Sequence, residues 1–408
     1  MKNKESIYII GAGISGLIAA YELEKAGLHP IIIEKTEEVG GRVKSVKEKG
    51  FTLDIGFQVL LSAYPLAKKY LDFDALELKT LKSGALIYVK DKGFRIGDPM
   101  RDWKIFLPTL FSDIGSIKDK IKILLLNKRL KHKSIEEIFL SPETTTLQYL
   151  IEFGFSTKVI DRFFKPFFGG IFLESNLKTS SRMFEFVYKM FGIGNATIPR
   201  LGIGQISHQL KNKLKNTEFR LNSEVKEVTS KHILMNSGQE IPHHGVIVAS
   251  NVNSIISGYK KPELNWNTCT CFYFEVDQTN IPNSTIALIS DDGNYANNLY
   301  AYKDDESGKT ILSVTTLAYD KKSKEEILAK IISEIKKYTG ALKVTFIQLF
   351  EIPKALPDIY KLRMTVKQEE LQVMDSVFLA GDSLMNASLN AAMESGRLAA
   401  LALLENRK

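Results

Sequence analysis

The sequence has little cysteine and no long apolar run, and both shortages narrow the class of protein. Its two cysteines, Cys269 and Cys271, are separated by one residue. This spacing is neither the CxxC of redox proteins nor a zinc-ligand set, so we expect free, buried thiols in a reducing cytosol. No stretch approaches the roughly 18 apolar residues that a spanning helix needs, and we expect none.

Histidine is also scarce, and the excess of basic residues has no matching nucleic-acid motif. The six histidines are scattered, and the adjacent pair His243 and His244 resembles a hairpin turn more than a ligand pair, so no metal site is predicted. A net charge of +8 is compatible with nucleic acid or an anionic membrane, but also with general solubility. We expect no nucleic-acid partner.

The composition is that of a globular protein with several structural units. Of the 408 residues, 44% are apolar and 25% charged, which argues against a disordered or fibrous chain. The length is sufficient for two or three units with cores of their own. The first residues resemble the start of a signal peptide, but glycines interrupt the apolar stretch, so we predict a cytoplasmic protein.

The first 35 residues carry the strongest pattern in the chain. An apolar run at 7–10 enters a glycine turn, a helical pattern follows to Ala26 and Gly27, and a second apolar run ends at Glu34. In such a turn the first glycine permits the bend, the second admits a diphosphate and the third packs helix on strand. Glu34 stands about where a carboxylate takes ribose hydroxyls. The predicted dinucleotide-binding residues are Gly11, Ala12, Gly13, Ile14, Ser15, Gly16, Glu34 and Lys35.

A second glycine pair indicates which dinucleotide is bound. Gly40, Gly41 and Arg42 follow Glu34 within eight residues, and the segment 50–58 ends in Gly56, Phe57 and Gln58. This stretch resembles the flavin-containing amine oxidase superfamily, which includes protoporphyrinogen oxidase and phytoene desaturase. The resemblance implies FAD, with the paired glycines passing its diphosphate and ribityl chain and Arg42 adding charge-assisted bonds.

The far end of the chain supplies an independent match. An apolar strand pattern at 377–380 runs into Gly381 and Asp382, and Ser388 is a natural N-cap for a helix that extends to about Leu404. This resembles the second FAD motif of the superfamily, which implies that the aspartate binds the ribityl or phosphate region. The helix would direct its positive end at the flavin. Ser388, Leu389 and Asn390 are therefore included in the predicted site.

The resemblance also predicts the fold class and the domains. We expect an α/β protein with a discontinuous Rossmann-like FAD-binding domain at 1–62, 198–262 and 366–408. A substrate-binding domain with an antiparallel sheet would span 63–100 and 263–365, and a helical cap would span 101–197. In relatives, the backbone of the residue matching Val225 holds the adenine, and the residues matching Ala249 and Ser250 close over the nucleotide.

Two stretches of the predicted cap leave alternatives open. Residues 103–133 have a basic helical pattern, typical either of a helix lying on a membrane or of a packed cap helix with a solvated face. Residues 142–195 are rich in aromatics, which could form the walls of an apolar pocket or an ordinary helical core. A peripheral membrane contact is therefore one hypothesis.

The chemistry expected is that of an FAD-dependent oxidoreductase acting on an apolar, polycyclic or polyene small molecule. Tyr360 is the candidate catalytic residue at the flavin face, although the motif around it departs from that of protoporphyrinogen oxidases. There are two alternatives. One is a flavin oxidase of polar amines, which two tyrosines flanking the flavin would indicate. The other is a non-enzymatic relative of the Rab GDP-dissociation inhibitors. The intact glycines, Glu34 and Asp382 argue against the last. The sequence does not identify the electron acceptor, whether oxygen, a quinone or a nicotinamide.

Overall fold

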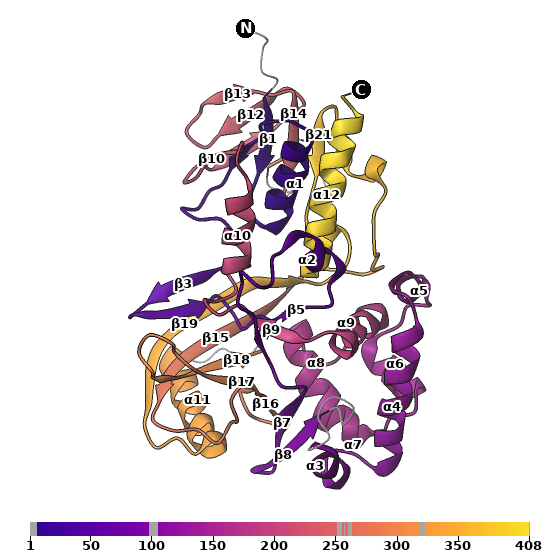
Figure 1. Cartoon of the computed structure of the whole chain (residues 1–408), viewed down its shortest axis with the longest axis vertical. Helices are drawn as coiled ribbons and strands as arrows, with labels where there is room; N and C mark the ends of the chain where they lie inside the picture. Colours follow the sequence, from indigo (N-terminus) through magenta and orange to yellow (C-terminus); the bar gives the residue numbers. More distant parts are fainter. Residues whose placement is uncertain are drawn as a thin grey trace.

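A parallel sheet forms the upper unit of the molecule in the computed structural model, which describes residues 6–97, 105–250, 255–256, 258–259, 263–317 and 323–407 (Figure 1). All neighbouring strands in it run parallel except the edge pair β20 and β21. The order is β10 (Glu218–Arg220), β2 (Ile31–Ile33), β1 (Ile7–Ile10), β14 (Gly245–Val248), β21 (Val377–Leu379) and β20 (Gln372–Met374). Strands β1 and β21, from opposite ends of the chain, are thus separated only by β14, which is an arrangement typical of doubly wound nucleotide-binding sheets.

Two helices from opposite ends of the chain pack closely in this unit. Helix α1 (Ile14–Lys25) follows β1, and α12 (Leu389–Glu405) follows β21. A Cβ on Gly396 would lie 2.2 Å from the Ser15 carbonyl oxygen, so only glycine permits this approach. The remaining helices of the unit are α2 (Pro65–Tyr70) and α10 (Gln205–Lys213), and a small sheet of β11 (Val225–Val228), β12 (His232–Met235) and β13 (Glu240–Pro242) flanks it.

Replacement of Gly396 by alanine is expected to destabilise the upper unit. The new methyl group must push α12 away from α1, and overpacking of this kind costs about 1–3 kcal/mol. Urea unfolding followed by circular dichroism would measure the loss. The matched control is Gly192→Ala, because a Cβ on Gly192 meets no atom within 4 Å; equal stability of the two variants would contradict the close packing.

A seven-stranded sheet forms the second unit, with α11 (Lys324–Thr339) packed on it (Figure 1). Its strands are antiparallel except that β16 and β7 pair in parallel, so the antiparallel expectation holds for all but one pair. The order is β19 (Val344–Pro357), β15 (Trp266–Val276), β18 (Thr310–Thr316), β17 (Ala296–Lys303), β16 (Ile286–Ile289), β7 (Gly84–Val89) and β8 (Lys92–Gly97). Cys269 and Cys271 are free and buried in β15, as predicted.

Short strands connect the two units. The hairpin of β3 (Ser45–Glu48) and β4 (Phe51–Asp54) follows the second glycine pair. A three-stranded piece contains β5 (Leu60–Leu61), β9 (Ala196–Ile198) and β6 (Lys79–Thr80). Strand β9 directly follows the helical cap in the sequence. This three-stranded sheet therefore joins the end of the cap to the segment 60–80, which connects the upper unit to the seven-stranded sheet.

The cap is helical and lies beside the seven-stranded sheet (Figure 1). It contains α3 (Phe106–Phe111), α4 (Ile117–His132), α5 (Ile135–Leu140), α6 (Thr146–Glu152), α7 (Thr157–Val159), the π-helical turn η2 (Ile160–Phe164), α8 (Lys165–Phe172) and α9 (Ser181–Ile193). The basic pattern predicted as one helical stretch is interrupted at residues 112–116, where Ser116 caps α4; residues 103 and 104 lie outside the described residues.

The aromatic residues of the cap form its core rather than the walls of a pocket. Five phenylalanines of the cap are almost fully buried: Phe164, Phe168, Phe172, Phe184 and Phe186. The first four contact one another in pairs with ring centroids 4.7–6.3 Å apart, and the ring centroid of Phe186 lies 5.5 Å from that of Phe139. Of these five, only Phe172 lines a cavity that the structure describes. Aromatics at helical spacing pack against each other first, so the core alternative is the correct one.

Candidate functional site

The glycine turn after β1 leads into a helix N-terminus that no side chain caps. Gly13 is the N-cap of α1, with ordinary extended backbone, and no side chain caps it. A Cβ on Gly16 would lie 2.0 Å from the Gly11 carbonyl oxygen, whereas a Cβ on Gly13 would meet no atom within 4 Å. The turn is therefore closed on the side of Gly16 and open at Gly13. Uncapped N–H groups at the positive end of a helix favour a diphosphate there.

Glu34 is held in place at the end of β2. One oxygen, Oε2, accepts from the backbone N–H of Ala12 at 2.8 Å, and Oε1 accepts from the Thr36 backbone N–H and hydroxyl, both at 2.9 Å. A carboxylate offers about four lone-pair positions. One position on Oε2 therefore stays available for a ribose hydroxyl, while Lys35 beside it is exposed.

Arg42 joins the two predicted FAD motifs directly. Its Nη2 lies 2.5 Å from Oδ1 of the buried Asp382, 340 residues later in the sequence. Its guanidinium lies 5.5 Å from the ring centroid of Trp266. Gly40 and Gly41 precede it with positive φ, and the Gly40 N–H donates to the Ala12 carbonyl. The second glycine pair thus lies against the first turn, and its arginine reaches the carboxy-terminal turn.

The second motif enters α12 through a tightly bonded turn. Ser388 caps the helix by accepting from the Ala391 N–H at 3.0 Å, as predicted. The Gly381 N–H donates to the Ser395 hydroxyl of the same helix. Leu389 begins the helix, and the side chain of Asn390 accepts from the Leu66 N–H. The positive end of α12 consequently faces the junction between the units, where the flavin ring is expected.

The other predicted cofactor residues contact the glycine turns directly or through a neighbouring residue. Ala249 and Ser250 follow β14, and a Cβ on Gly11 would meet the Ala249 carbonyl oxygen at 2.9 Å. Gln58 donates to the Arg42 carbonyl oxygen. Phe57, after Gly56, packs against Tyr300 with 5.3 Å between the two ring centroids. Val225 lies in the separate small sheet, linked to the site because the Ser223 N–H donates to the Glu34 carbonyl.

A cavity of about 450 Å³ begins at the second motif and extends between the cap and the seven-stranded sheet. Asn386 and Ala387, immediately before the cap of α12, line it, together with Phe172 and Met183 of the cap and Leu356 of β19. A second hollow of about 310 Å³ shares Lys178, Thr179, Asn267 and Asp358 with it. A molecule in the first cavity would therefore contact the turn that leads into α12.

Tyr360 lines this cavity, but its side chain is mostly open to solvent. It is 80% exposed. The neighbouring Leu362 is fixed by an N–H bond to Glu143 and by Arg182 Nη1, which donates to its carbonyl oxygen. Tyr360 thus belongs to an anchored segment at the opening of the cavity.

Asp54, at the end of β4, gives the site region a pH dependence. Burial raises its pKa to about 6, while hydrogen bonds from Ser45 Oγ and the Ile203 N–H oppose the shift. Between the ordinary value of 3.8 and about 6, the folded state binds more protons than the unfolded state. The free energy of unfolding should therefore fall by up to about 3 kcal/mol as the pH rises through this window.

The variant Asp54→Asn should remove that fall, because an amide does not titrate. Urea unfolding of both proteins at pH about 4 and about 7 would test this, with the variant gaining stability relative to the wild type at the higher pH. If the free energy of unfolding of the variant fell between the two pH values as much as that of the wild type, the pH dependence would arise from other groups.

Several residues of the site carried no signal in the sequence. Thr36 holds Glu34, Ser395 holds Gly381, and Trp266 lies over Arg42. Asn386 and Ala387 could have been found from their position before the N-cap, since a helix N-terminus aimed at a ligand places the preceding turn beside it as well.

The arrangement fits an FAD molecule. The open face of Gly13 offers room for a diphosphate beside uncapped N–H groups, and Glu34 keeps a free position for the ribose. Asp382, Arg42 and the α12 N-terminus continue the same path to the cavity. Among the described residues, no group of three or more His, Cys, Asp or Glu side chains could hold a metal ion. In the same part of the chain, no helix is long and apolar enough to cross a bilayer.

Comparison with known proteins gives matches along nearly the whole chain. A family model described as flavin containing amine oxidoreductase matches residues 14–404. The fold is similar to a putative protoporphyrinogen oxidase from Exiguobacterium sp. 255-15, with a TM-score of 0.71, 16% identity and coverage of 98% of this chain and 99% of the other. It is also similar to putrescine oxidase bound to putrescine, with a TM-score of 0.69, 16% identity, and coverage of 98% and 99%. The predicted α/β class is confirmed.

Curated relatives match only a short stretch. A 4,4'-diapophytoene desaturase (4,4'-diaponeurosporene-forming) from Staphylococcus haemolyticus is 47% identical over 49 residues, which is 12% of this chain and 10% of the relative. The match thus spans about a tenth of the length of such relatives. It does not distinguish among their substrates.

Proposed function

Because the chain belongs to the family of flavin-containing amine oxidoreductases, we propose that it dehydrogenates or isomerises an apolar, polycyclic or polyene substrate. Membership of the family confirms two expectations from the sequence: the cofactor is FAD, and the protein is an FAD-dependent oxidoreductase. When bound at this site, FAD would supply the hydride acceptor for the reaction. The contribution of the protein is to bind, orient and shield the reactants.

The residues proposed to hold FAD divide its length among them. Gly13 and the first turn of α1 take the diphosphate, and Glu34 takes the ribose of the adenosine half. Arg42 and Asp382 take the ribityl region, and the α12 N-terminus supplies positive potential beside the ring. Phe57 and Gln58 lie along the same path, and Tyr360 contacts the substrate at the opening of the cavity.

The observation that carries the substrate proposal is the charge balance of the cavity. Its charged lining residues are Glu143, Asp358, Lys178 and Lys361, two of each sign. Glu143 is moreover paired with Arg182 at 3.6 Å. A cationic amine would be favoured by an excess of negative charge, which this lining lacks. Apolar groups from Phe172, Met183, Leu356, Ile359 and Leu362 make up much of the remainder.

The aromatic content of the cavity supports the same choice. Within the described part of the chain, Tyr360 is the one tyrosine that lines this cavity. The pair of tyrosines that would favour an amine oxidase is therefore missing from that lining. A substrate without polar groups resides in lipid, so a peripheral contact with a membrane surface is part of the same proposal.

Anaerobic bleaching of the bound flavin tests the proposal. The holoprotein is mixed separately with a polyene, a porphyrinogen and a primary amine, and flavin absorbance is followed. Bleaching by an apolar compound and not by the amine is the expected result, and Tyr360→Ala should slow that bleaching while its FAD content is unchanged. Bleaching by the amine alone would establish the amine oxidase alternative instead. Bleaching by none of the three would count against the proposed class.

A further inference from the structure

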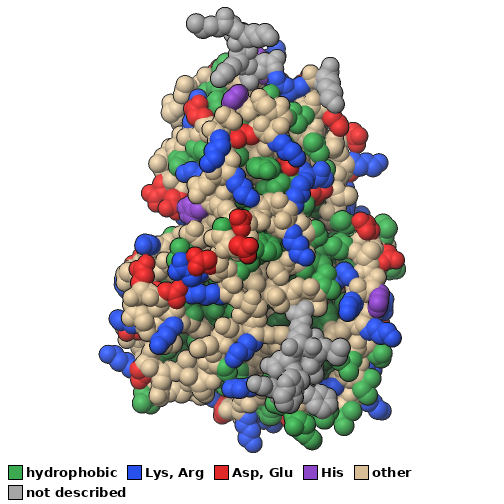
Figure 2. All heavy atoms as spheres, in the orientation of Figure 1, with side chains coloured by type: hydrophobic (Ala, Val, Ile, Leu, Met, Phe, Trp, Pro, Cys, Tyr) green, Lys and Arg blue, Asp and Glu red, His purple; other side chains and the backbone are tan. Residues whose placement is uncertain are grey.

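Helix α4 has an outward face that is both apolar and basic. Ile117, Ile121, Leu124 and Leu125 are 51–65% exposed on it. Lys118, Lys128, Arg129 and Lys131 are also exposed on this helix. The opposite face is buried through Leu126 and Leu130. Figure 2 shows hydrophobic and basic side chains intermixed on the side of the molecule where the cap lies.

The outward face carries no negative charge. The single acidic residue of α4 is Asp119, which is buried on the inner side. The exposed residues of the helix therefore contribute four positive charges and no carboxylate. Isolated surface leucines need no explanation, but four aliphatic side chains in about two turns, on a helix whose exposed charged residues are all cations, are unusual for a solvated helix.

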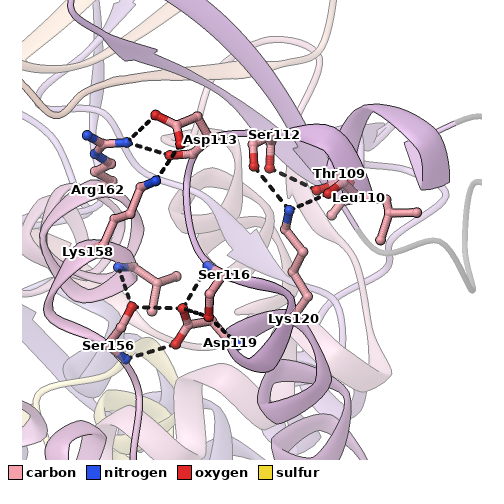
Figure 3. Close-up of polar contacts among 11 residues, drawn as sticks. Thr109, Leu110, Ser112, Asp113, Ser116, Asp119, Lys120, Ser156, Lys158 and Arg162 are labelled. Atoms are coloured by element: carbon pink, nitrogen blue, oxygen red, sulfur yellow. Dashed lines mark hydrogen bonds and ion pairs between the residues drawn. The ribbon is translucent and has the colours of Figure 1, made fainter.

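A polar network fixes the orientation of this face (Figure 3). Asp119 accepts from Ser116 at the helix cap and from both the N–H and hydroxyl of Ser156 on the neighbouring segment. Lys120 donates to the carbonyl oxygens of Leu110 and Ser112, which fastens the end of α3. The inner face of α4 is thus occupied by specific bonds, and the apolar side chains cannot turn inward.

The exposed carboxylate of Asp113, just before α4, is neutralised by two cations. Asp113 pairs with Lys158 and Arg162, and these hydrogen bonds lower its pKa to about 2 (Figure 3). The three groups together carry one positive charge. Phe111, the last residue of α3 and two residues before Asp113 in the sequence, is 79% exposed. The segment between α3 and α4 and its two cationic partners therefore add apolar surface and positive charge near the start of α4.

We propose that the outward face of α4 docks the protein on an anionic lipid surface. The aliphatic side chains would enter the boundary between headgroups and acyl chains, and each lysine or arginine would add electrostatic attraction to an anionic leaflet. A second copy of the chain is a poorer occupant, because pairing this face with itself would bring four cations against four cations. The proposal rests on the membrane contact of the proposed function and assigns it to one surface; its test measures binding alone, so it can fail while the proposed reaction holds.

The position of α4 relates this surface to the cavity. Its C-terminal carbonyls at Leu130 and Lys131 accept from Lys189 of α9. The same helix, α9, carries Met183, which lines the cavity. A protein docked through α4 would hold the cap against the lipid, one helix away from the cavity.

Vesicle flotation of the holoprotein tests the proposal. Vesicles of phosphatidylcholine alone are compared with vesicles that also contain phosphatidylglycerol, at low and high salt. The wild type should float with the anionic vesicles and at least tenfold less with the neutral ones. Lys128→Glu with Lys131→Glu, or Ile121→Ser with Leu125→Ser, should each reduce anionic binding at least tenfold, with FAD content and thermal stability unchanged.

The matched control changes a leucine and a lysine elsewhere on the surface. Leu342→Ser with Lys343→Glu removes the same kinds of side chain from the turn between α11 and β19, where Leu342 is 74% exposed. This variant should float like the wild type. Absence of anionic binding by the wild type, or equal binding by the α4 variants, would overturn the proposal. So would a concentration-dependent dimer that the α4 substitutions abolish, since the occupant would then be a second copy.

Discussion

Replacement of Gly13 by valine is expected to cost the protein its FAD while leaving its fold intact. The backbone of Gly13 has φ of −72° and ψ of 177°, a conformation that valine adopts readily. The new side chain would fill the open space beside the first turn of α1, where the diphosphate is proposed to lie. We expect FAD affinity to fall at least a hundredfold, or about 2.8 kcal/mol, in a fluorescence titration of the apoprotein.

The control for this variant is Gly192→Val. Gly192, in α9, likewise has no atom within 4 Å of an added Cβ, but lies outside the predicted cofactor site. Its FAD affinity should equal that of the wild type. Valine at the N-cap of α1 costs the fold about 1 kcal/mol, so a small loss of stability is expected in Gly13→Val. If this variant purified with a full complement of FAD, the diphosphate would have to lie elsewhere.

Removal of the Arg42 charge is expected to have the second large effect. In Arg42→Met the stem is kept, but Asp382 loses its partner at 2.5 Å and stays buried. Its negative charge would then face an anionic cofactor without compensation. We expect FAD affinity to fall ten- to a hundredfold, and the loss to be smaller in Asp382→Asn with Arg42→Met, where the uncompensated charge is absent.

An arginine of similar exposure provides the comparison. Arg200 pairs with Glu77 at 2.6 Å, and its side chain is 37% exposed against 42% for Arg42. Arg200→Met removes a surface ion pair away from the glycine turns and should leave FAD binding unchanged, since such pairs contribute little. Equal losses in the two variants would mean that charge in general, rather than the Arg42–Asp382 contact, governs affinity.

Local patterns accounted for most of the fold. The glycine turn and the N-cap Ser388 depend on residues within a few positions of one another, so the sequence was sufficient to predict them. The break between α3 and α4 was missed, because the cap at Ser116 depends on Asp119, which also bonds to Ser156.

Contacts between distant segments could not be predicted. Arg42 and Asp382 were each assigned to the cofactor, but their pairing depends on the order of β1, β14 and β21 in the sheet. The aromatic segment of the cap has the same spacing whether it forms a core or lines a pocket, and only packing shows that it forms the core. The exposure of Tyr360 likewise depends on how the segment after β19 lies over the cavity.

Titration of the apoprotein with FAD tests the central claim most directly, namely that both ends of the chain build one cofactor site. The absorbance and fluorescence of the flavin are followed in the wild type, in Gly13→Val and in Arg42→Met with its partner Asp382 intact. We predict one FAD per chain in the wild type and weakened binding at that same single site in both variants. A protein that stays colourless, or two independent sites of which each variant removes one, would contradict the claim.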